Sequence, residues 1–98
     1  MALNILLIED NHGDAFLIKE LLMEQDLTIS VDHCLTFSES LQRLDEQKNH
    51  YAAILLDLHL PDAFGNSLLQ SMTAVASEIP TIVLTGYGDI NLARKSLS

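Results

Sequence analysis

Residues 3–14 read LNILLIEDNHGD, and the aliphatic run from Ile5 to Ile8 stops abruptly at two adjacent acids, Glu9 and Asp10. An apolar run of this length is typical of a strand that is covered on both faces, as in a parallel sheet, so we predict a strand over residues 3–8. Two carboxylates at the edge of the same core would repel each other. We therefore expect Glu9 and Asp10 to have a partner that neutralises their charge.

Three other segments also predict strands. Residues 52–56 and residues 81–84 are short apolar runs, which suit strands buried on both faces. Residues 28–34 alternate between polar and apolar side chains instead. This alternation indicates a strand nearer the edge of the sheet.

The segments between these strands have apolar side chains at the spacing of a helix. Apolar side chains recur every three or four residues in three segments, which predicts three helices. The side chains expected to face the core are Ala15, Ile18, Leu21 and Leu22 in the first helix, Phe37, Leu41 and Leu44 in the second, and Leu68, Leu69, Met72, Val75 and Ala76 in the third. Thr36 and Glu39 fit a capping box at the start of the second helix. A short fourth helix is expected from about Asp89.

Strands and helices therefore alternate along the whole chain. This order predicts an α/β fold, a doubly wound parallel sheet with right-handed crossovers. No repeat or linker divides the 98 residues, so we expect a single domain. Cys34 is the only cysteine, which excludes an internal disulfide and predicts a buried thiol.

The composition excludes several classes of function. The chain carries 5 Lys and Arg residues against 14 Asp and Glu residues, a net charge of -9. This balance argues against direct binding of nucleic acid, which needs a basic surface. No apolar run approaches the roughly 20 residues of a membrane span, and the N-terminus lacks the features of a secretory signal. We expect a cytoplasmic protein that does not enter a membrane.

Polar side chains gather at the ends of the predicted strands. Glu9 and Asp10 follow the first strand, Asp57 ends the third, and Thr85 ends the fourth. In an open parallel sheet, ligands bind beyond the carboxyl ends of the strands, so we expect these side chains to converge. Mg²⁺ suits such a site best, because it takes one or two carboxylates and leaves positions for water and phosphate oxygens.

Other interpretations of these residues remain open. Glu9 and Asp10 could form a solvated turn, and Asp14 and Asp62 are expected as loop or first-turn residues near helix N-termini. The histidines show no paired spacing on one helix, which argues against a zinc site. They are expected as loop or surface residues: His12, His33, His50 and His59.

Three segments together resemble the receiver domain of two-component response regulators. They are ILLIEDN near the start, ILLDLHLPDAFG in the middle and PTIVLTG later, and the resemblance covers essentially the whole chain. Pro61 and Gly65 follow Asp57 at the family's spacing, where Pro61 would rigidify the loop and Gly65 would permit a tight turn into the next helix. The resemblance implies a flavodoxin-like fold with the strand order 2-1-3-4.

The resemblance also implies a role for each matched residue. Asp57 would be the phosphoacceptor, which takes a phosphoryl group from a histidine kinase or a phosphotransfer protein. Asp10 and Asp57 would ligate Mg²⁺ together with the backbone carbonyl of His59, and Glu9 would act through water. Thr85 would contact a phosphoryl oxygen and act as a switch.

The switch that the resemblance implies starts at this threonine. A phosphoryl group adds a charge of about -1.5 to -2 and three strong acceptors. Thr85 would move toward it and reposition the following loop and helix, so residues 86–97 would form the surface that controls a partner or an output domain.

The sequence departs from the family at its C-terminus. The family's fold has a fifth strand and a fifth helix, and a lysine and an aromatic residue there take part in the switch. This chain stops at Ser98 in the expected fourth helix, and Lys95 is not at the place of that lysine. We therefore expect residues 1–98 to be a receiver domain that is incomplete at its C-terminus. Residues 81–84 would then form an open apolar edge, which predicts a dimer or aggregate.

Three alternatives belong to other classes. The first is an interaction module that is not phosphorylated. The second is a phosphatase with an aspartate nucleophile, but such enzymes carry a second Asp where this chain has His59. A P-loop nucleotidase is disfavoured because no phosphate-cradling G-x-x-x-x-G-K-[ST] motif is present. We expect a signalling phosphoacceptor, and not an enzyme that turns over a small substrate.

Overall fold

The computed structural model describes residues 3–47 and 50–84, which form four strands and three helices. The strands are β1 (Leu3–Ile8), β2 (Ile29–Cys34), β3 (Ala53–Asp57) and β4 (Thr81–Leu84), and the helices are α1 (His12–Gln25), α2 (Phe37–Gln47) and α3 (Gly65–Val75). This is the predicted order, and every strand begins and ends within one residue of its predicted bounds. None of these helices has the length and hydropathy of a membrane span. The helix expected from about Asp89 lies outside the described residues.

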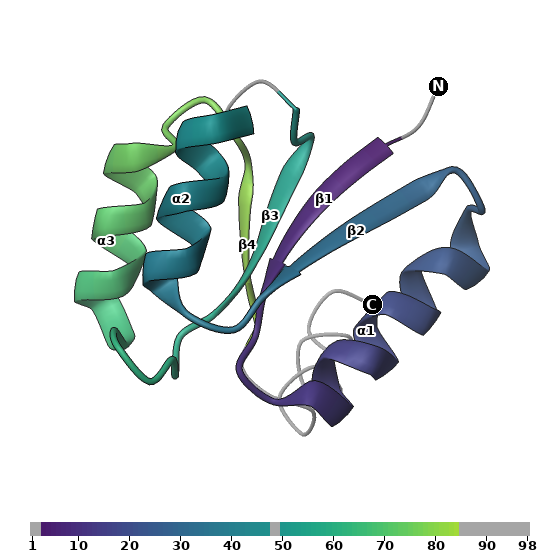
Figure 1. Cartoon of the computed structure of the whole chain (residues 1–98), viewed down its shortest axis with the longest axis horizontal. Coiled ribbons are helices and arrows are strands. Elements are labelled where there is room, and N and C mark those ends of the chain that lie inside the picture. The colour runs from purple at the N-terminus through teal and green to yellow at the C-terminus, as the bar shows by residue number, and fades with distance from the viewer. Residues whose placement is uncertain (1–2, 48–49, 85–98) are drawn as a thin grey trace, which may run out of the picture.

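The four strands form one parallel sheet in the order β2-β1-β3-β4. Figure 1 shows α1 on one face of the sheet and α2 and α3 on the other. The predicted doubly wound sheet and its strand order are therefore confirmed. Strands β2 and β4 are the edges of the described sheet, and association of two chains through β4 stays a prediction.

The two central strands, β1 and β3, are buried on both faces. Beneath α2 and α3 lie Leu6, Ile8, Ile54 and Leu56, and beneath α1 lie Ile5, Leu7 and Leu55. Successive side chains of a strand point to opposite faces, so burial on both faces requires the continuous apolar runs seen in the sequence. The packing holds the carboxyl ends of β1 and β3 in fixed positions.

Two side chains that were predicted to face the core are exposed instead, Leu21 of α1 and Val75 of α3. Helix α1 buries Ala15 and Ile18, and Leu21 lies off this stripe because each helical residue is turned by about 100° from the last. Val75 is the last residue of α3 and lines a small groove beside α2. For these two residues the sequence prediction was wrong.

The predicted capping box at the start of α2 is present. The backbone N–H of Glu39 donates to Thr36 Oγ1 at 3.0 Å. Glu39 Oε1 accepts in return from the backbone N–H of Leu35 at 3.0 Å, one residue earlier than the usual partner. The box explains why α2 begins at Phe37.

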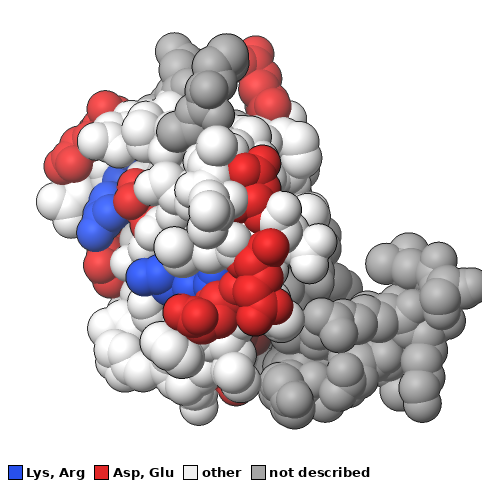
Figure 2. Space-filling model, turned by 90° about the vertical axis from the view of Figure 1, so that its right-hand side faces the viewer, with Lys and Arg blue, Asp and Glu red and all other residues white. Residues whose placement is uncertain are grey.

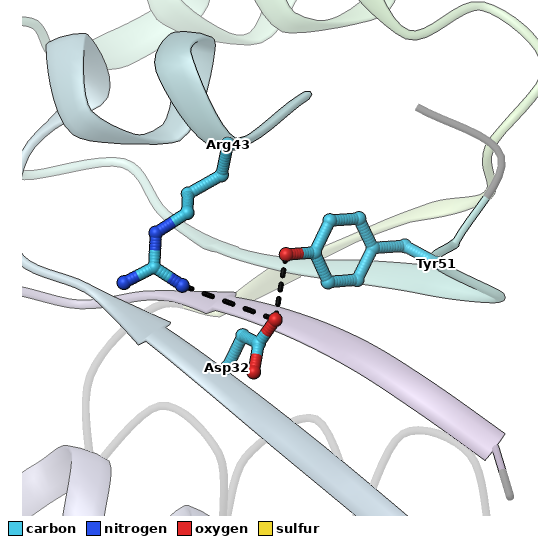
Figure 3. Close-up of polar contacts among 3 residues, drawn as sticks. All are labelled: Asp32, Arg43 and Tyr51. Atoms are coloured by element: carbon cyan, nitrogen blue, oxygen red, sulfur yellow. Dashed lines mark hydrogen bonds and ion pairs between the residues drawn. The ribbon is translucent and has the colours of Figure 1, made fainter. Parts of the chain in front are cut away.

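Polar contacts link edge strand β2 to helix α2 and to the segment before β3. The buried Tyr51 hydroxyl donates to Asp32 Oδ2 at 2.7 Å, and Arg43 Nη1 lies 3.9 Å from the same oxygen. In Figure 3 both side chains point toward the Asp32 carboxylate, one from α2 and one from the segment before β3. Burial and this hydrogen bond raise the pKa of Tyr51 to about 12, so its hydroxyl remains a donor at neutral pH.

Acidic side chains cover more of the face drawn in Figure 2 than basic ones do. Among the described residues, Lys19 and Arg43 are the only lysine and arginine. A protein surface with this balance attracts cations and repels anions.

The Tyr51 contact leads to a prediction about stability. Tyr51→Phe should lower the free energy of unfolding by about 1–2 kcal/mol, because it removes a hydrogen bond to a charged acceptor from a buried position. Urea denaturation measures this loss. Asp32→Asn is the control, since it keeps an acceptor and should cost less. Equal stability of Tyr51→Phe and the parent chain would contradict the assignment.

Candidate functional site

Strand register places the acids of β1 and β3 side by side. Ile8 of β1 pairs with Leu56 of β3, so the next residue on each strand, Glu9 and Asp57, lies at the same edge of the sheet. Asp57 in turn pairs with Leu84, the last residue of β4. The register thus brings Glu9 and Asp57 together, as the sequence predicted.

Three carboxylates meet at this edge. One oxygen from each of Glu9, Asp10 and Asp57 lies within 4.8 Å of the others. Glu9 is 3% exposed and Asp57 is 6% exposed, whereas Asp10 is exposed to solvent. Two unit charges about 4 Å apart repel by about 4 kcal/mol at an effective dielectric of 20, so the cluster needs a proton or a cation.

Glu9 shows this need most directly. The pKa of Glu9 is raised to about 9. Burial is the largest cause, followed by hydrogen bonding with Asp57 and repulsion from it, and then by repulsion from Asp10 and Asp14. Its Oε2 atom is buried and has no hydrogen-bond partner. Without a cation, Glu9 therefore carries a proton at neutral pH.

The Asp57 carboxylate is oriented by the loop that follows it. The backbone N–H of His59 donates to Asp57 Oδ1 at 3.0 Å. Beyond this contact, the loop closes on itself through a bond from the Leu60 N–H to the Ala63 carbonyl and one from the Gly65 N–H to the Leu58 carbonyl. Gly65 has a φ of 69°, a left-handed conformation that favours glycine.

His33 was expected as a loop or surface residue, but it lies half-buried in strand β2, from which it contacts the backbone of Glu9. His33 Nε2 lies 2.6 Å from the backbone carbonyl oxygen of Glu9. A carbonyl can only accept, so Nε2 carries the hydrogen in this contact. The ring of His12 meets that of His33 edge to face, with centroids 6.1 Å apart. The alternation of residues 28–34 predicted the strand that carries His33, but it did not predict this contact with Glu9.

The other predicted residues fall in different places. Asp14 lies in the first turn of α1, where its N–H donates to the cap residue Asn11. Asp62 was expected near a helix N-terminus, and its carboxylate caps α2, which precedes it in the chain. Thr85 lies outside the described residues.

The three acids fit a hard divalent cation. Mg²⁺ prefers carboxylate and other oxygen ligands, and it keeps several waters. The unpartnered Glu9 Oε2 and the crowded carboxylates are the features that such an ion would satisfy. In the part of the chain that the structure describes, this is the only cluster of three or more potential metal-ligating side chains.

Fold and site together define a doubly wound α/β protein whose acids lie at the carboxyl edge of the sheet. The chain belongs to the response regulator receiver domain family, whose sequence profile matches residues 5–98. Receiver domains of this family are phosphoacceptor signalling domains of two-component systems.

Several characterised proteins are similar to this chain. Sporulation initiation phosphotransferase F of Bacillus subtilis is 26% identical over 93 residues, which are 94% of this chain and 71% of that protein. A two-component response regulator of Arabidopsis thaliana is 28% identical over 86 residues, 88% of this chain and 22% of that protein. The chain spans about a fifth of the length of this regulator and of a methanogenesis regulatory protein of Methanothrix harundinacea.

Solved structures share the fold over nearly the whole chain. The non-phosphorylated HemR receiver domain of Leptospira biflexa is 31% identical with a TM-score of 0.67, covering 95% of this chain and 74% of that one. A response regulator receiver domain protein of Clostridium thermocellum is 25% identical with a TM-score of 0.73, covering 97% of this chain and 74% of that one.

The raised pKa of Glu9 gives a pH dependence with a definite sign. Between about pH 4.5, the ordinary carboxyl pKa, and about pH 9, Glu9 binds a proton in the folded chain but not in the unfolded chain. The stability of the metal-free chain should therefore fall as the pH rises through this range. Glu9→Gln cannot ionise, and it should be more stable than the parent chain by about 1–3 kcal/mol near pH 8. Urea denaturation in EDTA from about pH 5 to 9 measures both. A parent curve that rises with pH would contradict the assignment.

Proposed function

We propose that Asp57 accepts a phosphoryl group from a histidine kinase or a phosphotransfer protein and that this event switches the chain between two signalling states. The observation that carries the proposal is the buried Asp57 carboxylate, which ends β3 beside Glu9 and Asp10 in a chain of the receiver family. A buried acid at this position would be costly as a purely structural residue.

Asp10 and Asp57 would hold Mg²⁺ directly, with the backbone carbonyl of His59 as a third ligand and Glu9 acting through water. When bound, Mg²⁺ would supply positive charge to the phosphoryl oxygens. The unpartnered Glu9 Oε2 and the spacing of the three acids support this assignment.

The transfer itself needs a well-placed carboxylate. One oxygen of Asp57 attacks the phosphorus while the P–N bond to the donor histidine breaks. An acyl phosphate forms on Asp57, and the imidazole nitrogen leaves with the bonding electron pair. The His59 N–H holds Asp57 Oδ1 before the reaction, so the carboxylate does not have to reorganise.

The response would pass through the C-terminal part of the chain. Thr85 follows β4, whose last residue, Leu84, pairs with Asp57 in the sheet. A hydrogen bond from Thr85 to the new phosphoryl group would reposition residues 86–97 and thereby control an output domain or a partner protein.

Intact mass spectrometry tests the proposal. The chain is incubated with Mg²⁺ and phosphoramidate, a small phosphodonor, and should gain the mass of one phosphoryl group. Asp57→Asn should gain none. Asp45→Asn is the matched control, because it makes the same charge change at an exposed position of α2 and should be phosphorylated normally. No gain by the parent chain, or an equal gain by Asp57→Asn, would contradict the proposal.

A further inference from the structure

The first turn of α2 donates two hydrogen bonds to a side chain in a distant loop. The backbone N–H groups of Phe37 and Ser38 donate to Asp62 Oδ1 and Oδ2, both at 2.9 Å. Asp62 lies in the loop between β3 and α3, the same loop that orients Asp57. These hydrogen bonds lower the pKa of Asp62 although burial alone would raise it, so the carboxylate is charged at neutral pH.

The two bonds complete the cap of α2. A helix begins with four N–H groups that have no partner within the helix. In α2, Glu39 N–H donates to Thr36 Oγ1, and the N–H groups of Phe37 and Ser38 donate to Asp62. Ser40 N–H makes the first regular helical bond, to the Thr36 carbonyl at 3.2 Å. Both oxygens of the Asp62 carboxylate are therefore engaged by α2.

Asp62 does not cap the helix that follows it. The N-cap of α3 is Phe64, whose side chain makes no capping hydrogen bond and is 70% exposed. Asp62 would be a favourable acid near that terminus, since negative charge is stabilising there. Its carboxylate is instead committed to α2, so the contact links two segments that are far apart in the sequence.

Hydrogen bonds within the loop connect Asp62 to Asp57. The Leu60 N–H donates to the Ala63 carbonyl at 3.0 Å across Asp62, and the Gly65 N–H donates to the Leu58 carbonyl at 2.9 Å around the whole loop. His59, within that loop, donates its N–H to Asp57 Oδ1. A shift of the Asp62 end would therefore move the group that orients the acceptor.

We propose that Asp62 is a positioning residue for phosphoryl transfer, which anchors the loop after Asp57 to the N-terminus of α2. Among the described residues, no hydrogen bond joins Asp62 to Asp57 or to the other two acids of the cluster. It acts by holding the His59 backbone in place. This role rests on the proposed phosphoacceptor function of Asp57.

The test compares Asp62→Ala with Thr36→Ala. Both variants remove side-chain capping from the same helix end, but only Asp62→Ala releases the loop. Asp62→Ala should slow phosphorylation by phosphoramidate with Mg²⁺ by about tenfold or more, because small misplacements of reacting groups cost rate steeply. Thr36→Ala should stay within about twofold of the parent chain, and Asp62→Asn, which keeps one acceptor oxygen, should fall between the two alanine variants.

Amide hydrogen exchange supplies a second readout that needs no phosphorylation. In EDTA, Asp62→Ala should speed exchange both in the first turn of α2 and in residues 58–65, whereas Thr36→Ala should speed it in α2 alone. A parent chain that gains no phosphate would overturn the proposed function, and loop exchange would still decide whether Asp62 anchors the loop. Equal rates and equal loop exchange for the two alanine variants would overturn the positioning role.

Discussion

The repulsion among three carboxylates at the end of β1 and β3 is the constraint on which the structure of the site depends. Glu9 and Asp57 are buried at this edge, and Asp10 lies with them at the surface. Core packing fixes the register that aligns Ile8 with Leu56, and this register places Glu9 and Asp57 side by side. The site is therefore held in a state that favours a cation or a proton.

The rest of the fold supplies the rigidity that this arrangement requires. β1 and β3 are central strands with apolar side chains packed on both faces, so the acids cannot relax apart by bending the sheet. Around them, contacts between distant segments hold the edges, as His33 does for the Glu9 backbone and Asp62 does for the loop after Asp57. The acids are clustered by the sheet, and the loops orient them.

The sequence predicted the fold and the site acids well because both depend on strong local patterns. Continuous apolar runs identified the central strands, and acids directly after Ile8 and at Asp57 had to meet in a parallel sheet. It did not predict the contacts of His33 and Asp62, which depend on how loops from distant segments meet in space. Leu21 was misplaced because apolar residues surround much of α1, which blurs the buried stripe.

A calorimetric titration with Mg²⁺ tests the central claim most directly. If the crowded acids form a cation site, the parent chain will bind one Mg²⁺ saturably at low millimolar concentration or below. Asp10→Asn and Asp57→Asn will each weaken binding by about tenfold or more, because each removes a charged ligand. Asp45→Asn, which changes the net charge equally at an exposed position of α2, will bind as the parent does. An equal weakening by all three variants, or no saturable binding to the parent chain, would contradict the account.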